Sequence, residues 1–205
     1  MAAQTAPTRA ITLEEFEAKY AGKRYEYVNG CAVPMGPEIV GHDGTVVVSQ
    51  IKPEHGLLTA ELIFHIGAFA REHKLGSVFG AEAGFIMRED TQDIRAADLA
   101  FISAARMSEV RIREWLPFPP DLAVEVVSEY DTAGEVREKA EDYIENGTRI
   151  LWVVYPHRRI IDVHRPGQPI VKLGVDDTLD AVDVLPGFSI PVRDIFAPLD
   201  ALASS

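Results

Sequence analysis

The chain has 205 residues, which suits a single domain with a sizeable buried core. Its one cysteine, Cys31, excludes an internal disulfide, and no apolar stretch approaches the roughly 20 residues that cross a bilayer, so we expect a cytoplasmic protein. The 32 acidic and 20 basic residues give a formal charge of −12, which counts against indiscriminate nucleic-acid binding but does not exclude a nuclease, because divalent cations neutralise the carboxylates that bind them.

The N-terminal region reads as a tail, a short helix and a hairpin. The first ten residues lack the apolar core of a signal peptide, and we expect a flexible tail there. Thr12-Leu13-Glu14-Glu15 has a capping-box pattern, which predicts a helix from about Leu13 to Tyr20. Asn29-Gly30 is a strong hairpin signal between strands predicted over 24–28 and 31–33.

The middle of the chain is dominated by one long helix. Apolar residues recur at helical spacing over Glu54–Lys74. Short strands are expected on either side of this helix, over 45–50, 77–80 and 84–88.

Two later apolar runs, 122–127 and 150–155, lack the alternation of a half-buried strand, which predicts strands covered on both faces. Between them, a second capping box over 132–135 begins a helix that runs to about Asn146 and ends at Gly147. Such a helix suits a right-handed crossover between parallel strands. Edge strands and a hairpin are expected over 160–164 and from 171 onward. We therefore expect residues 11–200 to form one α/β domain with a central mixed β-sheet flanked by helices.

The chain has no phosphate-binding loop, dinucleotide fingerprint or zinc-type cysteine pair, so the candidate chemistry is sought among its acids. Asp98 interrupts the apolar run 96–102, and Glu125 interrupts the run 122–127. A buried carboxylate costs free energy unless it is paired or binds metal. Asp98 could instead cap a neighbouring element or pair with Arg95, and Glu125 could form a buried ion pair. If the two strands are adjacent, however, the acids converge and Mg²⁺, which prefers oxygen ligands, would offset their repulsion.

Three further residues could join these acids. Lys139 borders the apolar stripe of its predicted helix and could stabilise charge on a phosphate, although it could simply pair with Glu135. Glu26 could add a third carboxylate or be a surface acid on an edge strand. His55 could contact a phosphate or a metal-bound water, although a lone histidine is more often structural.

The succession of these segments resembles the Uma-two family of restriction endonucleases. Residues 23–30 are similar to the family's opening Arg-Tyr-Glu-x-x-x-Gly motif. The resemblance extends over about Ile11 to Gly167, and its further segments are His55 with the helix that follows, 97–102, 120–128, 139–147 and 151–156.

The resemblance implies the PD-(D/E)XK nuclease fold and a Mg²⁺-dependent endonuclease, with Mn²⁺ as a substitute metal, that hydrolyses phosphodiester bonds of DNA. By matching position, Asp98 and Glu125 would bind the metal. Glu26 would be an additional acid and Lys139 the catalytic lysine. The lysine that the fold's name places two residues after Glu125 is replaced by Val127, and the family carries it on the following helix instead.

The chain departs from the family pattern at several positions: Ala97 stands in place of proline, Tyr155 in place of aspartate, and Glu129-Tyr130 in place of Pro-Ser. These changes are expected to alter the edge of the site or its substrate preference. They leave open a catalytically inactive nuclease-fold domain that binds a protein or nucleic acid, or an enzyme for a small phosphorylated molecule. Exposed hairpins that could pair hint at a homodimer.

Overall fold

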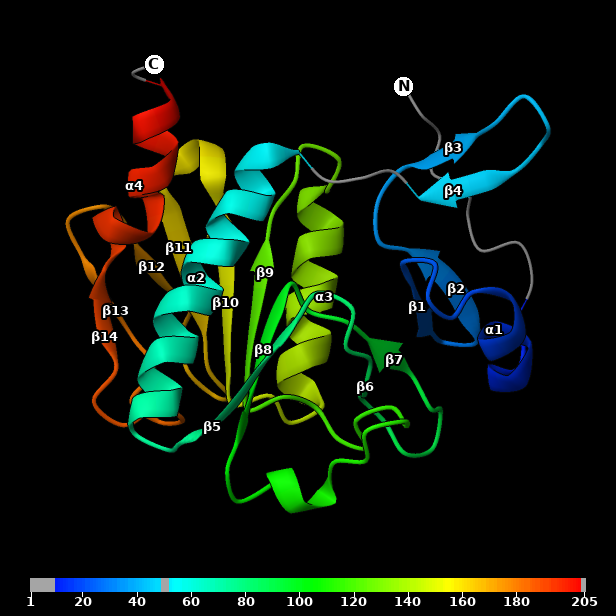
Figure 1. Ribbon diagram of the computed structural model, residues 1–205, viewed down its shortest axis with the longest axis horizontal. Coiled ribbons are helices and arrows are strands. Elements are labelled where there is room, and N and C mark those ends of the chain that lie inside the picture. Colours follow the sequence, from blue (N-terminus) through cyan, green and yellow to red (C-terminus); the bar gives the residue numbers. More distant parts are fainter. Residues whose placement is uncertain (1–9, 49–51, 204–205) are drawn as a thin grey trace.

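The computed structural model describes residues 10–48 and 52–203, so the expected tail over residues 1–10 lies almost wholly outside the described residues. A mixed six-stranded sheet forms the centre of the molecule (Figure 1). Its strand order is β12-β11-β10-β9-β8-β5, with only β9 and β10 parallel. The strands are β5 (Gly76–Gly80), β8 (Leu99–Ser103), β9 (Leu122–Val126), β10 (Ile150–Tyr155), β11 (Ile160–His164) and β12 (Val171–Leu173).

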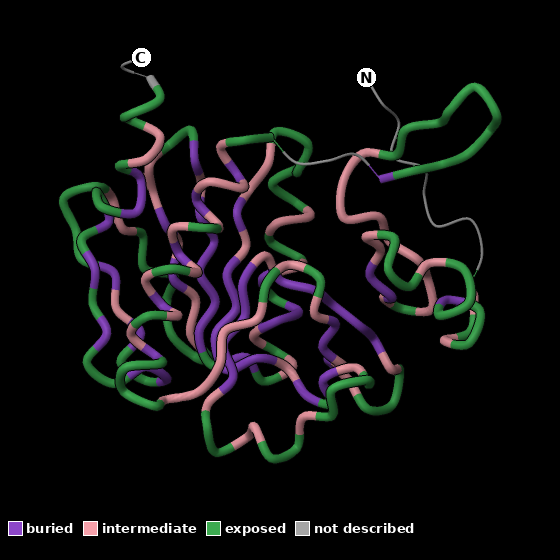
Figure 2. The backbone as a smooth tube through the Cα atoms, viewed as in Figure 1, coloured by how far each residue is buried: buried purple, intermediate pink, exposed green. Residues whose placement is uncertain are grey.

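Helices cover both faces of this sheet, which confirms the predicted fold class. The helices are α2 (Pro53–Glu72), α3 (Ala133–Glu145) and α4 (Val192–Ala203). Helices α2 and α4 pack on one face and α3 packs on the other. Successive side chains of β9 point to opposite faces of the sheet, so Leu122 and Val124 lie in the α2 layer whereas Ala123 lies in the α3 layer. Figure 2 shows the sheet as the most continuously buried part of the chain.

The N-terminal hairpin does not join the central sheet. It forms a second sheet of order β2-β1-β7-β6, beside which helix α1 lies (Figure 1). Its elements are α1 (Leu13–Lys19), β1 (Tyr25–Val28), β2 (Cys31–Pro34), β6 (Phe85–Ile86) and β7 (Ile94–Arg95). We call α1, β1–β4, β6 and β7 the N-terminal lobe.

Hairpin β3 (Glu38–Val40) and β4 (Val46–Val48) extends from this lobe. Its apolar side chains Ile39, Val40 and Val47 are exposed. The last residues of the strand expected over 45–50 lie outside the described part of the chain. The pairing of this hairpin with a second copy stays a prediction.

Three expectations about element bounds are wrong. The expected strand over 96–102 begins only at Leu99, because the chain crosses between the two sheets after β7, and the strand expected over 84–88 shrinks to the two residues of β6. The first strand begins at Tyr25 rather than Arg24, whose φ of 60° is left-handed and breaks an extended strand.

Helix α4 was not expected at all. Pro198 lies inside it, and proline normally ends a helix. It is preceded by the small hairpin β13 (Thr178–Asp180) and β14 (Ser189–Pro191). Among the described helices, none is long and apolar enough to cross a membrane.

Candidate active site

Asp98 and Glu125 meet at one end of the central sheet. Strands β8 and β9 are antiparallel, with Leu99 opposite Val124. One position further along this register, Asp98 lies beside Glu125. The backbone N–H of Val126 donates to Asp98 Oδ2 at 2.8 Å, so the carboxylate reaches the neighbouring strand directly. The convergence expected from the sequence is therefore present, although Asp98 immediately precedes β8 rather than lying within it.

His55 lies in the first turn of α2, with its side chain against the same carboxylate. Its Nε2 is 3.1 Å from Asp98 Oδ2, and its imidazole is buried. Burial acts to lower the pKa of His55, but the hydrogen bond and charge of Asp98 outweigh it, and the net pKa is raised. The protonated imidazole is thus favoured beside Asp98. The alternative that Asp98 pairs with Arg95 is wrong, because its ionic neighbour is His55.

Lys139 reaches the acids from α3. Its Nζ is 2.9 Å from Glu125 Oε2 and 3.4 Å from Glu26 Oε1. Burial acts to lower the pKa of Lys139, but the nearby carboxylates overcome it and raise the pKa well above its usual range. The lysine therefore stays charged and belongs to the acid cluster.

Glu26 is a buried acid on an interior strand of the small sheet, so a surface position on an edge strand is wrong. The backbone N–H of Ala96 donates to Oε1 at 3.0 Å, and the guanidinium of Arg95 donates to Oε2 at 3.0 Å. With Lys139 also beside Oε1, both oxygens of Glu26 are engaged by nitrogen donors.

Arg95 and Asp142 are site-supporting residues that the sequence did not single out in this role. The Arg95 Nε–H donates to Asp142 on α3, and a second arginine, Arg88, donates to the other Asp142 oxygen at 2.9 Å. Asp142 follows Lys139 by one helical turn, so the same helix holds the lysine and anchors the arginine. The three-residue spacing places Lys139 and Asp142 on one side of the helix, but nothing local in the sequence identifies Arg95 as the partner of Asp142.

Glu125 is the least satisfied acid of the cluster. Its Oε1 is buried and has no hydrogen-bond partner among the described residues. Burial raises its pKa to about 7, with Asp98 and Glu26 adding to the rise and Lys139 opposing it. The hydroxyl of Tyr143, one turn beyond Lys139, is likewise buried and lies beside Glu125, although it completes no hydrogen bond of good geometry within the described chain. Burial and the charge of Glu125 raise the pKa of Tyr143.

These residues fit a hard divalent cation. Glu125 has an unpartnered oxygen, and Asp98 is its neighbour in the β8–β9 register and acts on its charge. Both are oxygen ligands of the kind that Mg²⁺ and Mn²⁺ prefer. Mg²⁺ keeps several waters and needs only one or two protein carboxylates. Within residues 10–48 and 52–203 no cluster of three or more His, Cys, Asp or Glu side chains is arranged to hold a metal, so the closed four-ligand site typical of structural zinc is not formed there.

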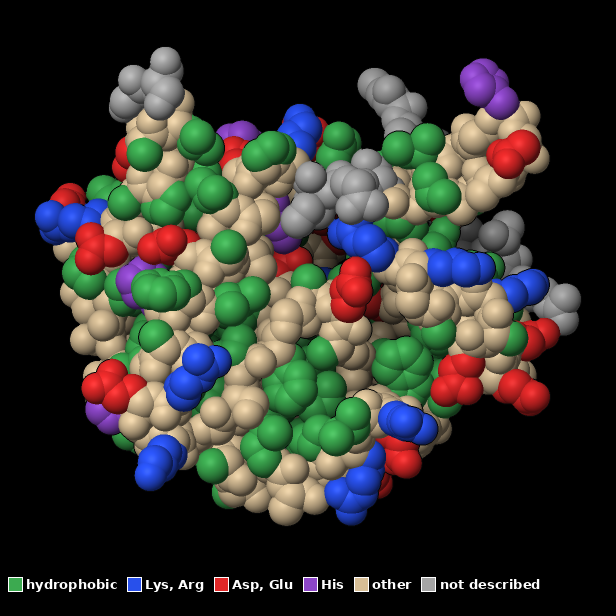
Figure 3. Space-filling model, viewed as in Figure 1, with side chains coloured by type: hydrophobic (Ala, Val, Ile, Leu, Met, Phe, Trp, Pro, Cys, Tyr) green, Lys and Arg blue, Asp and Glu red, His purple; other side chains and the backbone are tan. Residues whose placement is uncertain are grey.

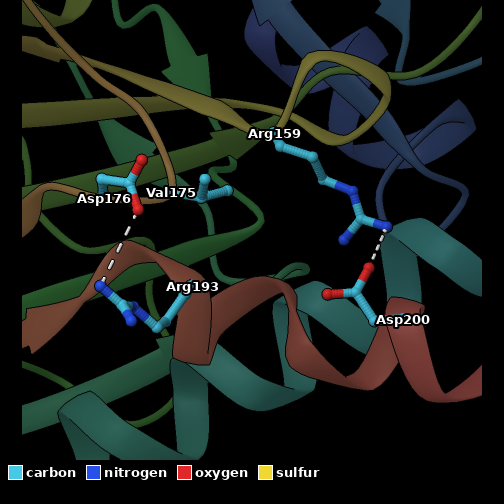
Figure 4. Close-up of a pocket in the computed structure, with 5 residues that line it drawn as sticks. All are labelled: Arg159, Val175, Asp176, Arg193 and Asp200. Atoms are coloured by element: carbon cyan, nitrogen blue, oxygen red, sulfur yellow. Dashed lines mark ion pairs between the residues drawn. The ribbon is translucent and has the colours of Figure 1, made fainter.

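A pocket of about 330 Å³ lies away from this acid cluster, near α4 (Figure 4). Its charged side chains are paired: Arg159 with Asp200 at 2.7 Å, and Arg193 with Asp176 at 3.9 Å. None of the acids discussed above lines it. It is therefore not the candidate active site.

Comparisons with known proteins identify the fold and the family of the chain. A solved structure from Anabaena variabilis, titled "a putative nuclease belonging to DUF820", superposes with a TM-score of 0.74 at 18% identity, covering 91% of this chain and 98% of that one. That likeness shows the fold. No curated protein matches the chain. The family model Uma2, described as "Putative restriction endonuclease", matches residues 38–193, a stretch that includes His55, Asp98, Glu125 and Lys139 but not Glu26. Because this match spans well over half of the sequence, the chain belongs to the Uma2 family.

Proposed function

We propose that the chain is a Mg²⁺-dependent endonuclease that hydrolyses phosphodiester bonds of DNA. The observation that carries the proposal is the position of Asp98 beside Glu125 in the β8–β9 register at the sheet end, with Lys139 2.9 Å from Glu125. Carboxylate ligands for a divalent cation and a charged lysine are groups that can promote phosphodiester hydrolysis. Membership of a family described as restriction endonucleases and a nuclease-like fold support the same activity.

Asp98 and Glu125 would hold Mg²⁺, with Mn²⁺ as a substitute. When bound, the cation would polarise the phosphate and lower the pKa of a water. The water oxygen would form a new bond to phosphorus and release a proton to solvent, while the bond to the leaving oxygen breaks and that oxygen takes up a proton from solvent. Lys139 would orient the water and offset the negative charge that develops on the phosphate oxygens.

Glu26 and His55 are assigned as positioning residues. The resemblance implied that Glu26 is a further acid of the site, but nitrogen donors already engage both its oxygens, which suits fixing Lys139 in place. His55 was expected to contact substrate. Its Nε2 instead faces Asp98, which suits orienting that ligand.

The test is cleavage of plasmid DNA with Mg²⁺ by the wild type, Asp98→Ala and Glu125→Ala. The matched control is Asp194→Ala, which removes an exposed acid on α4. We expect both site variants to lose cleavage and the control to keep it. Equal cleavage by all four proteins would discard the mechanism.

Isothermal titration with Mg²⁺ and Mn²⁺ tests the alternative of a catalytically inactive nuclease-fold domain. A wild type that neither cleaves DNA nor takes up either metal would support a binding module with a nuclease fold. Metal uptake that is lost in Asp98→Ala and Glu125→Ala would support the enzyme.

A further inference from the structure

A second, smaller cavity of about 120 Å³ adjoins the acid cluster, between the N-terminal lobe and the loops that precede β6 and β9. Glu26, which contacts Lys139, is part of its wall. Figure 3 shows the surface hollowed beside the N-terminal lobe, with acidic and basic side chains nearby. The other lining residues are Phe16, Ala21, Gly22, Arg24, Tyr25, Met35, Glu82, Gly84, Ile94, Ala96 and Trp115.

The size of this cavity admits a single ring. An apolar cavity of roughly 150 Å³ is enough to bind benzene. A volume of about 120 Å³ is below that reference, so it limits a ligand to at most one six-membered ring and is too small for a fused two-ring system.

Aromatic side chains form much of the wall and are held in place by their polar ends. The indole N–H of Trp115 donates to Glu17 at 3.1 Å, and the hydroxyl of Tyr25 donates to Glu38 at 2.6 Å. Gly84 lets Trp115 lie close against the backbone, since a Cβ at that position would come within 2.5 Å of the indole ring. The rings are thus fixed before any ligand arrives, which reduces the entropy cost of stacking a base against them.

The charges around the cavity favour a neutral ligand over a cation. Glu26 is already compensated by Arg95 and Lys139. Of the remaining lining residues, Arg24 and Glu82 carry opposite charges. A carboxylate such as that of Glu82 can accept a hydrogen bond from the exocyclic amine of a base.

We propose that this cavity binds one pyrimidine base of the DNA strand, next to the bond that is cut. The inference rests on the proposed nuclease function, because Glu26 places the cavity beside the catalytic lysine. A base inside a duplex is stacked and cannot enter such a cavity, so the substrate strand is single-stranded or locally opened there. The cavity would then set which nucleotide lies beside the cleaved phosphate.

The experiment measures binding without cleavage. Fluorescence anisotropy of a labelled, short oligodeoxycytidine is compared with that of an abasic strand of the same length and charge, in EDTA. Full-length wild type is compared with Trp115→Ala, Trp115→Phe and Ala21→Leu. Phe64→Ala is the control, since it removes an exposed aromatic ring from α2, outside the cavity.

We expect the wild type to bind the cytosine strand about tenfold more tightly than the abasic strand, within the usual range for stacking one base. Trp115→Ala should abolish this preference and Trp115→Phe should retain most of it. Ala21→Leu adds a larger side chain to the cavity from an exposed position and should also abolish the preference for the cytosine strand. This variant tests the proposal even if Trp115→Ala does not fold.

Equal binding of the two strands by the wild type would overturn the proposal, as would an equal preference for an adenine strand. Competition by methylguanidinium but not by deoxycytidine monophosphate would show a cation site and overturn it as well. These readouts do not depend on metal or turnover, so they are distinct from a failure of the plasmid assay.

Discussion

Lys139 balances the charge of the candidate active site. It lies 2.9 Å from one carboxylate and 3.4 Å from another, and these contacts raise its pKa despite burial. Glu125 shows the opposite behaviour, because burial raises its pKa and disfavours its charged form. At neutral pH the site therefore contains a permanent cation and a carboxyl group that is easily protonated.

Lys139→Met keeps the length of the side chain and removes its charge. We expect cleavage to fall by about 10²–10³-fold, the usual effect of losing one transition-state charge donor. Mg²⁺ affinity should not weaken, because a positive neighbour of the metal has been removed. Plasmid cleavage and isothermal titration measure the two effects, with Lys19→Met on the exposed face of α1 as the control. Unchanged cleavage in Lys139→Met would exclude a catalytic role.

The raised pKa of Glu125 predicts that the free energy of unfolding of the metal-free protein depends on pH. Its folded pKa of about 7 exceeds its ordinary value of 4.5, so the folded state binds the proton more tightly than the unfolded state. The stabilisation is fully present below about pH 4.5 and is lost as the pH rises through about 7. Its upper limit is about 3 kcal/mol.

Urea unfolding in EDTA at about pH 5 and about pH 8 would measure this contribution. The wild type should lose free energy of unfolding relative to Glu125→Gln as the pH rises. Glu141→Gln, which alters an exposed acid of α3, should follow the wild type. Parallel curves for the wild type and Glu125→Gln would show that Glu125 titrates normally.

Helix α3 is the element that assembles the site. It carries Lys139 toward Glu125 and, one turn later, Asp142 toward Arg95. Its start is fixed by a capping box, in which Thr132 Oγ1 accepts from the Glu135 N–H while the Glu135 carboxylate accepts from the Thr132 N–H. The position of Lys139 thus depends on a cap two turns before it.

Thr132→Ala should lower the free energy of unfolding by about 1 kcal/mol, the usual cost of losing an N-cap. Thr12→Ala is a matched control, because Thr12 and Glu15 form the same capping box on α1. Both variants should lose similar stability by urea unfolding, but only Thr132→Ala should reduce Mg²⁺-dependent cleavage. Equal cleavage by the two variants would show that the first turn of α3 does not position Lys139.

Local patterns explain which elements could be predicted from the sequence. The capped helix between two apolar runs correctly predicted α3 and the parallel pair β9–β10, because the signals lie within one short segment. Of the small sheet, the hairpin β1–β2 was correctly predicted from Asn29-Gly30, but the pairing of Tyr27 with Ile94 could not be, since it joins distant parts of the chain. Helix α4 was not predicted, because Pro198 lies inside it and proline usually ends a helix. Its apolar residues Ile195 and Phe196 are nevertheless buried.

The same reasoning applies to the candidate site. Asp98 and Glu125 stood out because each breaks an apolar run, and that signal is local. The partners of Arg95 and the engagement of both Glu26 oxygens arise only when the small sheet lies against α3. Side chains that act by contacting another element leave no trace at their own position.

At the scale of the whole molecule, Arg95 joins the two sheets. Its guanidinium is buried and contacts Glu26 of the small sheet and Asp142 of the helix that covers the central one. Burial acts against its charge, but these two carboxylates together raise its pKa further above the usual range. The N-terminal lobe is therefore attached to the body at the same point where it supplies an acid to the site.

Arg95→Met should destabilise the protein by up to about 3–5 kcal/mol, because Glu26 and Asp142 each lose a buried cationic partner and keep only Lys139 and Arg88. The triple variant Glu26→Gln, Arg95→Met, Asp142→Asn should recover much of that loss. Arg137→Met on the exposed face of α3 is the control and should cost at most about 1 kcal/mol. Urea unfolding measures all three, and a loss in Arg95→Met no larger than in the control would show that the buried network contributes little.

The buried ion pair between Arg95 and Glu26 also constrains which substitutions this sequence can accept during evolution. Loss of Glu26 would leave Arg95 with Asp142 as its one ionic partner among the described residues, and loss of Arg95 would leave Glu26 with Lys139, so either single substitution weakens the buried network and is disfavoured. We expect the two positions to co-vary, and homologues that lack one to lack the other. Such paired loss would mark the branches in which the N-terminal lobe no longer supplies an acid to the cluster.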